Sequence, residues 1–191
     1  MISVKYSYLS GRNKSLAPEK SYRDALAAIK DSGILSSSEA MNKINKLSEY
    51  YDQNRASLPP GSKRTRLMEE LSSMLWSLMP SVKNFPLRER LNSWRSDDRL
   101  SAYKYLEYKP GMDNLDLLIS SAIGVLEEPF GQYAALLALR RLVINVKTGT
   151  LEKELITRNL TWIARLEFMG SDREYLMNSI VSLLEKREKN N

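Results

Sequence analysis

The 191-residue chain contains neither cysteine nor histidine. Without cysteine it can form no disulfide, no thiol nucleophile and no thiolate metal site. Without histidine it lacks an imidazole base for acid–base catalysis and an imidazole ligand for a metal. Any catalysis would therefore depend on carboxylates, lysine, tyrosine or serine.

Enzyme motifs are missing as well: the sequence has no phosphate-binding Walker loop, no GxSxG elbow and no glycine-rich dinucleotide fingerprint. The carboxylate pairs that could act as acid and base are Asp97 with Asp98, Glu127 with Glu128, Glu69 with Glu70, and Asp113 with Asp116. Each pair lies at an expected helix end or on a helix surface, where capping and the helix dipole account for acidic residues. We therefore expect no enzyme, no catalytic residue, no metal and no cofactor.

Long apolar runs are also lacking, since the longest covers only residues 133–139. A membrane-spanning helix needs roughly 18 to 20 apolar residues. The first 14 residues have neither the apolar core nor the small-residue cleavage site of a secretory signal. We expect a cytoplasmic protein that does not associate with a membrane.

Positive charge exceeds negative charge: 29 Lys and Arg stand against 23 Asp and Glu, which gives a net charge of +6. This balance permits an anionic partner such as nucleic acid, an acidic protein or a nucleotide signal. Because 42% of the residues are hydrophobic, the chain can still bury a core. Its length suits a single domain.

Apolar residues recur every three or four positions along most of the chain, which predicts an all-α protein. We expect about nine helices, joined by short turns, in a single α-helical domain over residues 18–191. Residues 1–17 instead alternate apolar and polar residues before a polar stretch. That alternation predicts an extended or flexible arm, which could pair with a partner chain as an added strand.

Several helix boundaries follow from capping signals. Ser36 with Glu39, and Ser171 with Glu174, have the spacing of capping boxes. After the first helix (18–32) and the helix that Ser36 begins, the expected helices cover residues 63–79, 87–94, 97–108, 113–126, 130–145, 151–168 and 171–188. Trp76, Trp94 and Trp162 fall within apolar stripes of these helices, so core packing is their expected role.

The helix expected after a Ser62 cap begins with three cations, Lys63, Arg64 and Arg66. The helix macrodipole disfavours cations in a first turn by roughly 0.3 to 1 kcal/mol each. The compensation is either internal, through Glu70 one turn after Arg66, or external, through a bound anion. The internal pairing is favoured because phosphate sites usually contain more glycine.

One pattern occurs twice between residues 97 and 146. The corresponding residues lie 33 positions apart: Leu100 and Tyr133, Ala102 and Ala135, Tyr103 and Leu136, Leu106 and Leu139. This spacing is typical of a helical-hairpin repeat. Because such a repeat buries its apolar face only against a neighbour, the stack usually provides a surface for binding.

The corner Glu128-Pro129-Phe130, followed by paired alanines at Ala134-Ala135, resembles the consensus of HEAT repeats. The resemblance covers residues 97–168, with 171–188 as a capping helix, although Gln132 replaces the usual arginine. The segments GSKRTRLMEEL and DRLSAYKYL, followed by EEPFGQYAALLAL, also look like a helical module of bacterial signalling and antiviral-defence proteins. That resemblance implies an adaptor or sensor whose partner is an effector protein encoded nearby.

Helix ends account for the acids of the repeat region but leave many of its cations unexplained. The candidate binding residues are Lys63, Arg64, Arg66, Arg88, Arg90, Trp94, Arg95, Arg99, Arg140 and Arg141. Protein interaction is the favoured function, because a repeat provides surface and catalytic residue types are lacking. The alternative is a basic helical ridge that binds nucleic acid or a nucleotide signal, with Trp94 stacked on a base.

Overall fold

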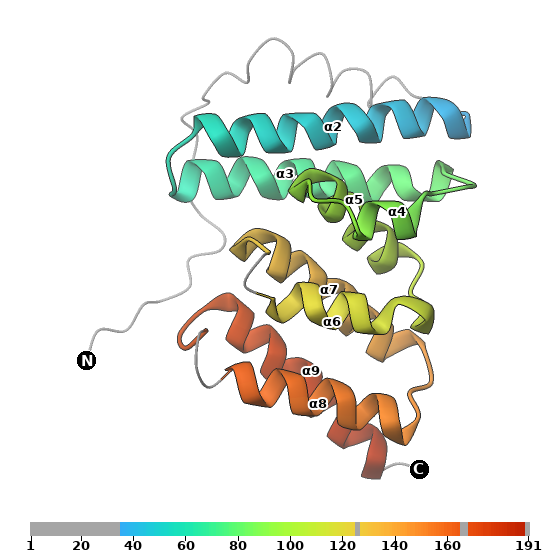
Figure 1. Ribbon diagram of the computed structural model, residues 1–191, viewed down its shortest axis with the longest axis vertical. Coiled ribbons are helices and arrows are strands. Elements are labelled where there is room, and N and C mark those ends of the chain that lie inside the picture. The colour runs from blue at the N-terminus through green and yellow to red at the C-terminus, as the bar shows by residue number, and fades with distance from the viewer. Residues whose placement is uncertain (1–34, 125–126, 165–167, 190–191) are drawn as a thin grey trace. The chain divides into compact units, whose positions relative to one another are not determined.

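The computed structural model describes residues 35–124, 127–164 and 168–189, and the regular structure within these ranges is helical (Figure 1). The helices are α2 (Ser37–Ser57), α3 (Ser62–Leu78), α4 (Leu87–Leu91), α5 (Ser96–Tyr108), α6 (Leu115–Ile123), α7 (Pro129–Asn145), α8 (Thr150–Ala164) and α9 (Asp172–Lys189), with 3₁₀ turns η1 (Met79–Ser81) and η2 (Met112–Asn114). The prediction of an all-α protein is confirmed. The predicted arm (1–17) and first helix (18–32) lie outside the described residues. No helix in the described ranges is long and apolar enough to cross a membrane.

The capping box at the start of α2 is present as predicted. The Ser36 hydroxyl accepts a hydrogen bond from the Glu39 amide at 3.3 Å, and the Glu39 carboxylate accepts one from the Ser36 amide at 2.9 Å. The Ser36 hydroxyl also donates to the Glu39 carboxylate at 2.6 Å, and this bond, together with the one from the Ser36 amide, lowers the pKa of Glu39. At α9 only half of the predicted box forms, because the Glu174 carboxylate accepts from the Gly170 amide at 2.5 Å instead of from Ser171.

The predicted Ser62 cap of α3 is wrong by one residue. Gly61 occupies the N-cap position with φ +150°, a conformation that favours glycine, and no side chain caps the helix. Ser62 is already helical. The internal pair expected for the basic first turn is present, since Arg66 Nε donates to Glu70 Oε1 at 3.2 Å.

Some helices end earlier than the apolar periodicity predicts. α4 ends at Leu91, and the backbone of Asn92 is no longer helical. Trp94 therefore lies outside the helix and is 89% exposed, so its predicted core role is wrong. α6 ends at Ile123, whereas the predicted end of α8 falls partly outside the described residues, which reach Ala164 before a gap. In α9, Leu176, Met177 and Ile180 are buried, whereas Tyr175 is exposed.

Helix α5 is surrounded by other helices. It packs against α2, α3, α4 and α7, and three consecutive residues, Ser101, Ala102 and Tyr103, are fully buried. Consecutive residues of a helix point in different directions, so their burial requires neighbours on several sides. α5 nevertheless also carries Asp97, Asp98 and Arg99, which need partners inside the protein.

α2 packs with α3, and the helices that follow form three further hairpins that pack on one another. α4 packs with α5, α6 with α7, and α8 with α9, while α7 also contacts α5 and α9 (Figure 1). The second helices of the three hairpins thus form one row. α5 and α7 begin 33 residues apart, at Ser96 and Pro129. Of the four residue pairs that lie 33 positions apart in the repeat, three are buried in both α5 and α7. In the fourth pair Leu100 is buried in α5, whereas Tyr133 in α7 is partly exposed.

Small residues at the packed face of α7 should be essential for stability. Ala135 is fully buried. Ala135→Leu should therefore overpack the helix contact and lower the free energy of unfolding by about 1 to 3 kcal/mol. Ala56→Leu, at an exposed position of α2, is the matched control and should change it by less than about 0.5 kcal/mol. Urea unfolding of both variants measures the difference, and equal effects would contradict close packing at Ala135.

Candidate interaction surface

The loop between α4 and α5 is held by two arginines that follow it. Arg95 forms a bidentate pair with Asp97, at 3.0 Å to Oδ1 and 2.6 Å to Oδ2. The Asp97 side chain is only 1% exposed and lies in the first turn of α5, where the helix dipole favours an acid. The hydrogen bonds with Asp97 raise the pKa of Arg95.

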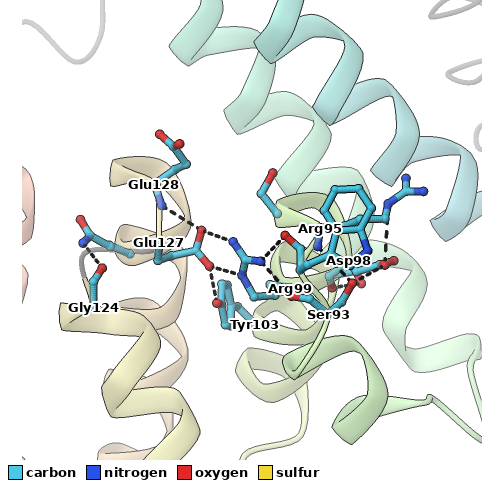
Figure 2. A network of polar contacts seen from close by, with 12 residues as sticks. Ser93, Arg95, Asp98, Arg99, Tyr103, Gly124, Glu127 and Glu128 are labelled. Atoms are coloured by element: carbon cyan, nitrogen blue, oxygen red, sulfur yellow. Dashed lines mark hydrogen bonds and ion pairs between the residues drawn. The ribbon is translucent and has the colours of Figure 1, made fainter.

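Arg99 connects this loop to the corner between α6 and α7. Its Nη1 atom donates to the backbone oxygens of Ser93 and Trp94, each at 2.8 Å. On its other side, Nε donates to Glu127 Oε2 at 2.6 Å and Nη2 to Oε1 at 3.2 Å (Figure 2). The hydrogen bonds to Glu127 raise the pKa of Arg99. One guanidinium therefore fixes two segments that lie 28 residues apart in the chain.

The Glu127 carboxylate is almost completely buried, with 4% of its side chain exposed. Besides the two bonds from Arg99, it accepts one from the Tyr103 hydroxyl at 2.6 Å and one from the Glu128 amide at 2.9 Å (Figure 2). A carboxylate has about four lone-pair sites, so Glu127 is saturated. Burial, and then the charge of Glu127, raise the pKa of Tyr103.

Gly131 leaves room for this carboxylate. A β-carbon at residue 131 would lie 2.4 Å from Glu127 Oε1 and 2.6 Å from its Cδ atom. Any larger residue at this position would have to displace Glu127, which four hydrogen bonds hold in place.

Arg90 ties α4 to α5 and α2. Its guanidinium donates to the Ser101 hydroxyl at 2.7 Å, bonds to the Asn45 side chain and lies 3.4 Å from Asp98. Burial lowers the pKa of Arg90. Its guanidinium also lies 5.5 Å from the centre of the Phe85 ring, within cation–π range. This arginine therefore serves the fold.

Arg55 connects α2 to the same region. It donates to the Ser96 hydroxyl at 3.1 Å and forms an ion pair with Glu128. The first turn of α5 and the corner before α7 are thereby both attached to α2.

These contacts hold the backbone of the loop that carries Trp94. Its carbonyl is bound by Arg99, and the preceding residue, Ser93, donates from its hydroxyl to Asp98 at 2.9 Å. The indole is nevertheless 89% exposed, the largest exposure among the large hydrophobic side chains of the described residues. An aromatic side chain on a braced backbone pays little conformational entropy when it binds a partner.

The predicted binding residues therefore fall into two groups. Arg90, Arg95 and Arg99 come together around the loop, and each has a carboxylate partner within the chain. The other group is more exposed: Lys63, Arg66, Arg88 and Arg141 are exposed, while Arg64 and Arg140 are partly exposed. Arg140 lies about 16 Å along α7 from its first residue, so it does not join the loop cluster.

Sequence reasoning missed the groups that organise the site. The sequence pattern marks Glu127 only as one of a pair of acids, and Tyr103 only as a position of the repeat. Their partner Arg99 lies 28 and 4 residues away in sequence. No local pattern marks a contact between an arginine and a glutamate on separate hairpins, so only the packing of α5 against α7 reveals it.

Within the described ranges, no three acidic side chains gather as a metal site requires. No protein-family model matches the chain, and neither a curated protein nor a solved structure is detectably similar to it.

Gly131→Ala should destabilise the protein even though alanine favours helices by about 1 kcal/mol over glycine. The added β-carbon would displace Glu127 and cost about 1 to 3 kcal/mol. Gly111→Ala is the matched control, because nothing lies within 4 Å of its β-carbon position and its φ is −157°. Chemical unfolding measures the free energy of unfolding of both variants. A Gly131→Ala variant more stable than the unchanged chain would show that Glu127 moves freely.

Stability should fall as the pH rises above about 10, where tyrosines of the unfolded chain ionise. Burial raises the pKa of Tyr103 and Tyr51, so both stay protonated in the folded protein and their contribution is complete below that pH. Above about pH 10, each of these two tyrosines should lower the free energy of unfolding by up to about 1.4 kcal/mol per pH unit. Tyr103→Phe should flatten this slope in urea unfolding between pH 8 and 11. Tyr175→Phe, at a 76% exposed position, should leave it unchanged, and equal slopes for both variants would refute the assignment.

Proposed function

We propose that this chain is a non-catalytic protein-interaction module, built from HEAT-like helical hairpins, in which Trp94 is the anchor for a protein partner. The observation that carries the proposal is a large aromatic side chain, 89% exposed, on a loop held by Arg99, Arg95 and Ser93. Tryptophan and arginine are the residue types most enriched at the energetic centres of protein interfaces.

The local charge favours a protein over a nucleic acid. Residues 88–99 contain four arginines and three acids, and Glu127 supplies the fourth negative charge. The neighbourhood of Trp94 is therefore close to neutral. Nucleic-acid binding depends on phosphates that neutralise a surplus of Lys and Arg, and this loop has no such surplus.

Nucleic-acid binding remains the second candidate, and the exposed cations Lys63, Arg66, Arg88 and Arg141 support it. On that alternative, Trp94 would stack on a base and the cations would bind phosphates. The two candidates differ in their dependence on salt, since phosphate contacts release counterions and weaken steeply as salt rises.

The resemblance to helical modules of bacterial signalling and defence proteins names the partner to test first: an effector protein encoded beside this chain. In that role the chain is an adaptor or sensor, and the effector carries the chemistry.

Trp94→Ala should abolish partner binding without affecting the fold. The experiment is co-purification of the tagged full chain with proteins encoded by neighbouring genes, followed by affinity measurement. We expect a loss of at least about 30-fold, as for a tryptophan at an interface centre, and a change in unfolding free energy below about 0.5 kcal/mol.

Tyr175→Ala is the matched control, since it removes an aromatic side chain that is 76% exposed on α9. An equal loss for both variants would mean that binding is not centred on Trp94. If no protein is recovered while RNA or DNA shifts in a gel and is released by salt, the nucleic-acid candidate replaces the proposal.

A further inference from the structure

A shallow groove of about 300 Å³, lined by apolar and acidic side chains, lies between the start of α6 and the start of α8. Its apolar lining consists of Met112 and Leu115 on one side and Leu151 and Leu155 on the other. α6 and α8 contact one another directly, so both walls belong to one packed unit (Figure 1). None of these residues takes part in the network around Trp94.

The two leucines of α8 are exposed although they are apolar. Leu151 is 77% exposed and Leu155 is 37% exposed. They lie four residues apart, so they occupy the same face of the helix, one turn from each other. A single exposed leucine is ordinary, but Leu151 and Leu155 lie beside the partly exposed Met112, so a partner helix could bury these three side chains together.

The rest of the lining is acidic. Asp113, Asp116 and Glu152 complete the groove, and no Lys or Arg lines it. Asp116 and Glu152 lie in the first turns of α6 and α8, where the helix dipole favours them. Gly149 makes room for Glu152, since a β-carbon there would lie 2.5 Å from Oε2. The groove therefore combines exposed leucines with three acidic side chains.

We propose that this groove binds an amphipathic helix of a partner protein that presents two aliphatic side chains one turn apart, flanked by Lys or Arg. Helices commonly bind in this way, with apolar anchors in a groove and charges at its rim. The whole chain carries a net charge of +6, whereas the lining of this groove contains acids and no Lys or Arg. The acidic side chains of the groove attract the basic side chains of such a helix, so charge complementarity favours binding at this site. The groove is independent of Trp94.

The test uses the full chain and a labelled 16-residue peptide of leucine, lysine and alanine, with leucines placed four residues apart. Fluorescence anisotropy should show binding that weakens with salt. Two control peptides share its length: one replaces the leucines with serine, and the other replaces the lysines with glutamate. Each control should bind at least about tenfold more weakly, because it loses either the apolar burial or the charge pairing.

Protein variants then locate the site. Leu151→Gln should weaken the peptide about tenfold, and its high exposure means that the core is left intact. Asp113→Asn combined with Asp116→Asn should weaken binding and reduce its dependence on salt. Trp94→Ala should bind the peptide unchanged, which separates this test from that of the proposed function.

Other results would overturn the inference. Equal binding of the serine peptide would show simple charge attraction, and equal binding of the glutamate peptide would show unspecific apolar adhesion. If the leucine–lysine peptide does not bind at millimolar concentration, the groove is not a binding site for such a helix. The same follows if the Leu151→Gln variant binds the peptide as tightly as the unchanged chain. If the chain self-associates and Leu151→Gln abolishes that association, a second copy is the occupant instead.

Discussion

The buried ion pair between Arg99 and Glu127 is the constraint on which the centre of this structure depends. Their side chains are only 15% and 4% exposed, so removing either partner would leave an uncompensated charge, at a cost of about 3 to 5 kcal/mol. The ion pair is stable although it is buried, because both groups have their hydrogen-bond partners. The Tyr103 hydroxyl and the Glu128 amide donate to the carboxylate, and the guanidinium donates to two backbone carbonyls. It joins α5 to the corner that begins α7, and with it two successive hairpins.

The same pair determines what the surface offers. Because Arg99 holds the carbonyl of Trp94 and Asp97 holds Arg95, the loop is rigid while its cations are neutralised. What remains for a partner is an exposed indole, with little unbalanced charge around it. A surface of this kind suits a protein better than a polyanion, since apolar burial rather than counterion release would supply the binding energy.

Much of the local structure could be predicted. The helical class follows from apolar periodicity, the Ser36 box from its spacing, and the Arg66–Glu70 pair from a separation of one turn. Periodicity also assigned to the core Trp76, which is 38% exposed on α3. Two other predictions failed because the backbone decided the outcome. Asn92 ends α4 before Trp94, which places in water an indole that periodicity assigned to the core. Gly61, in a conformation that favours glycine, takes the capping position predicted for Ser62.

The sequence by itself therefore determined the elements: which segments are helical, how several of them begin, and which chemistries the lack of cysteine and histidine excludes. These properties depend on residues within a few positions of one another, so they can be read along the chain. The tertiary structure alone decided which arginines serve the fold and which face solvent. That choice depends on carboxylates brought from other helices, Glu127 to Arg99 above all, and such contacts exist only once α5 and α7 have packed together.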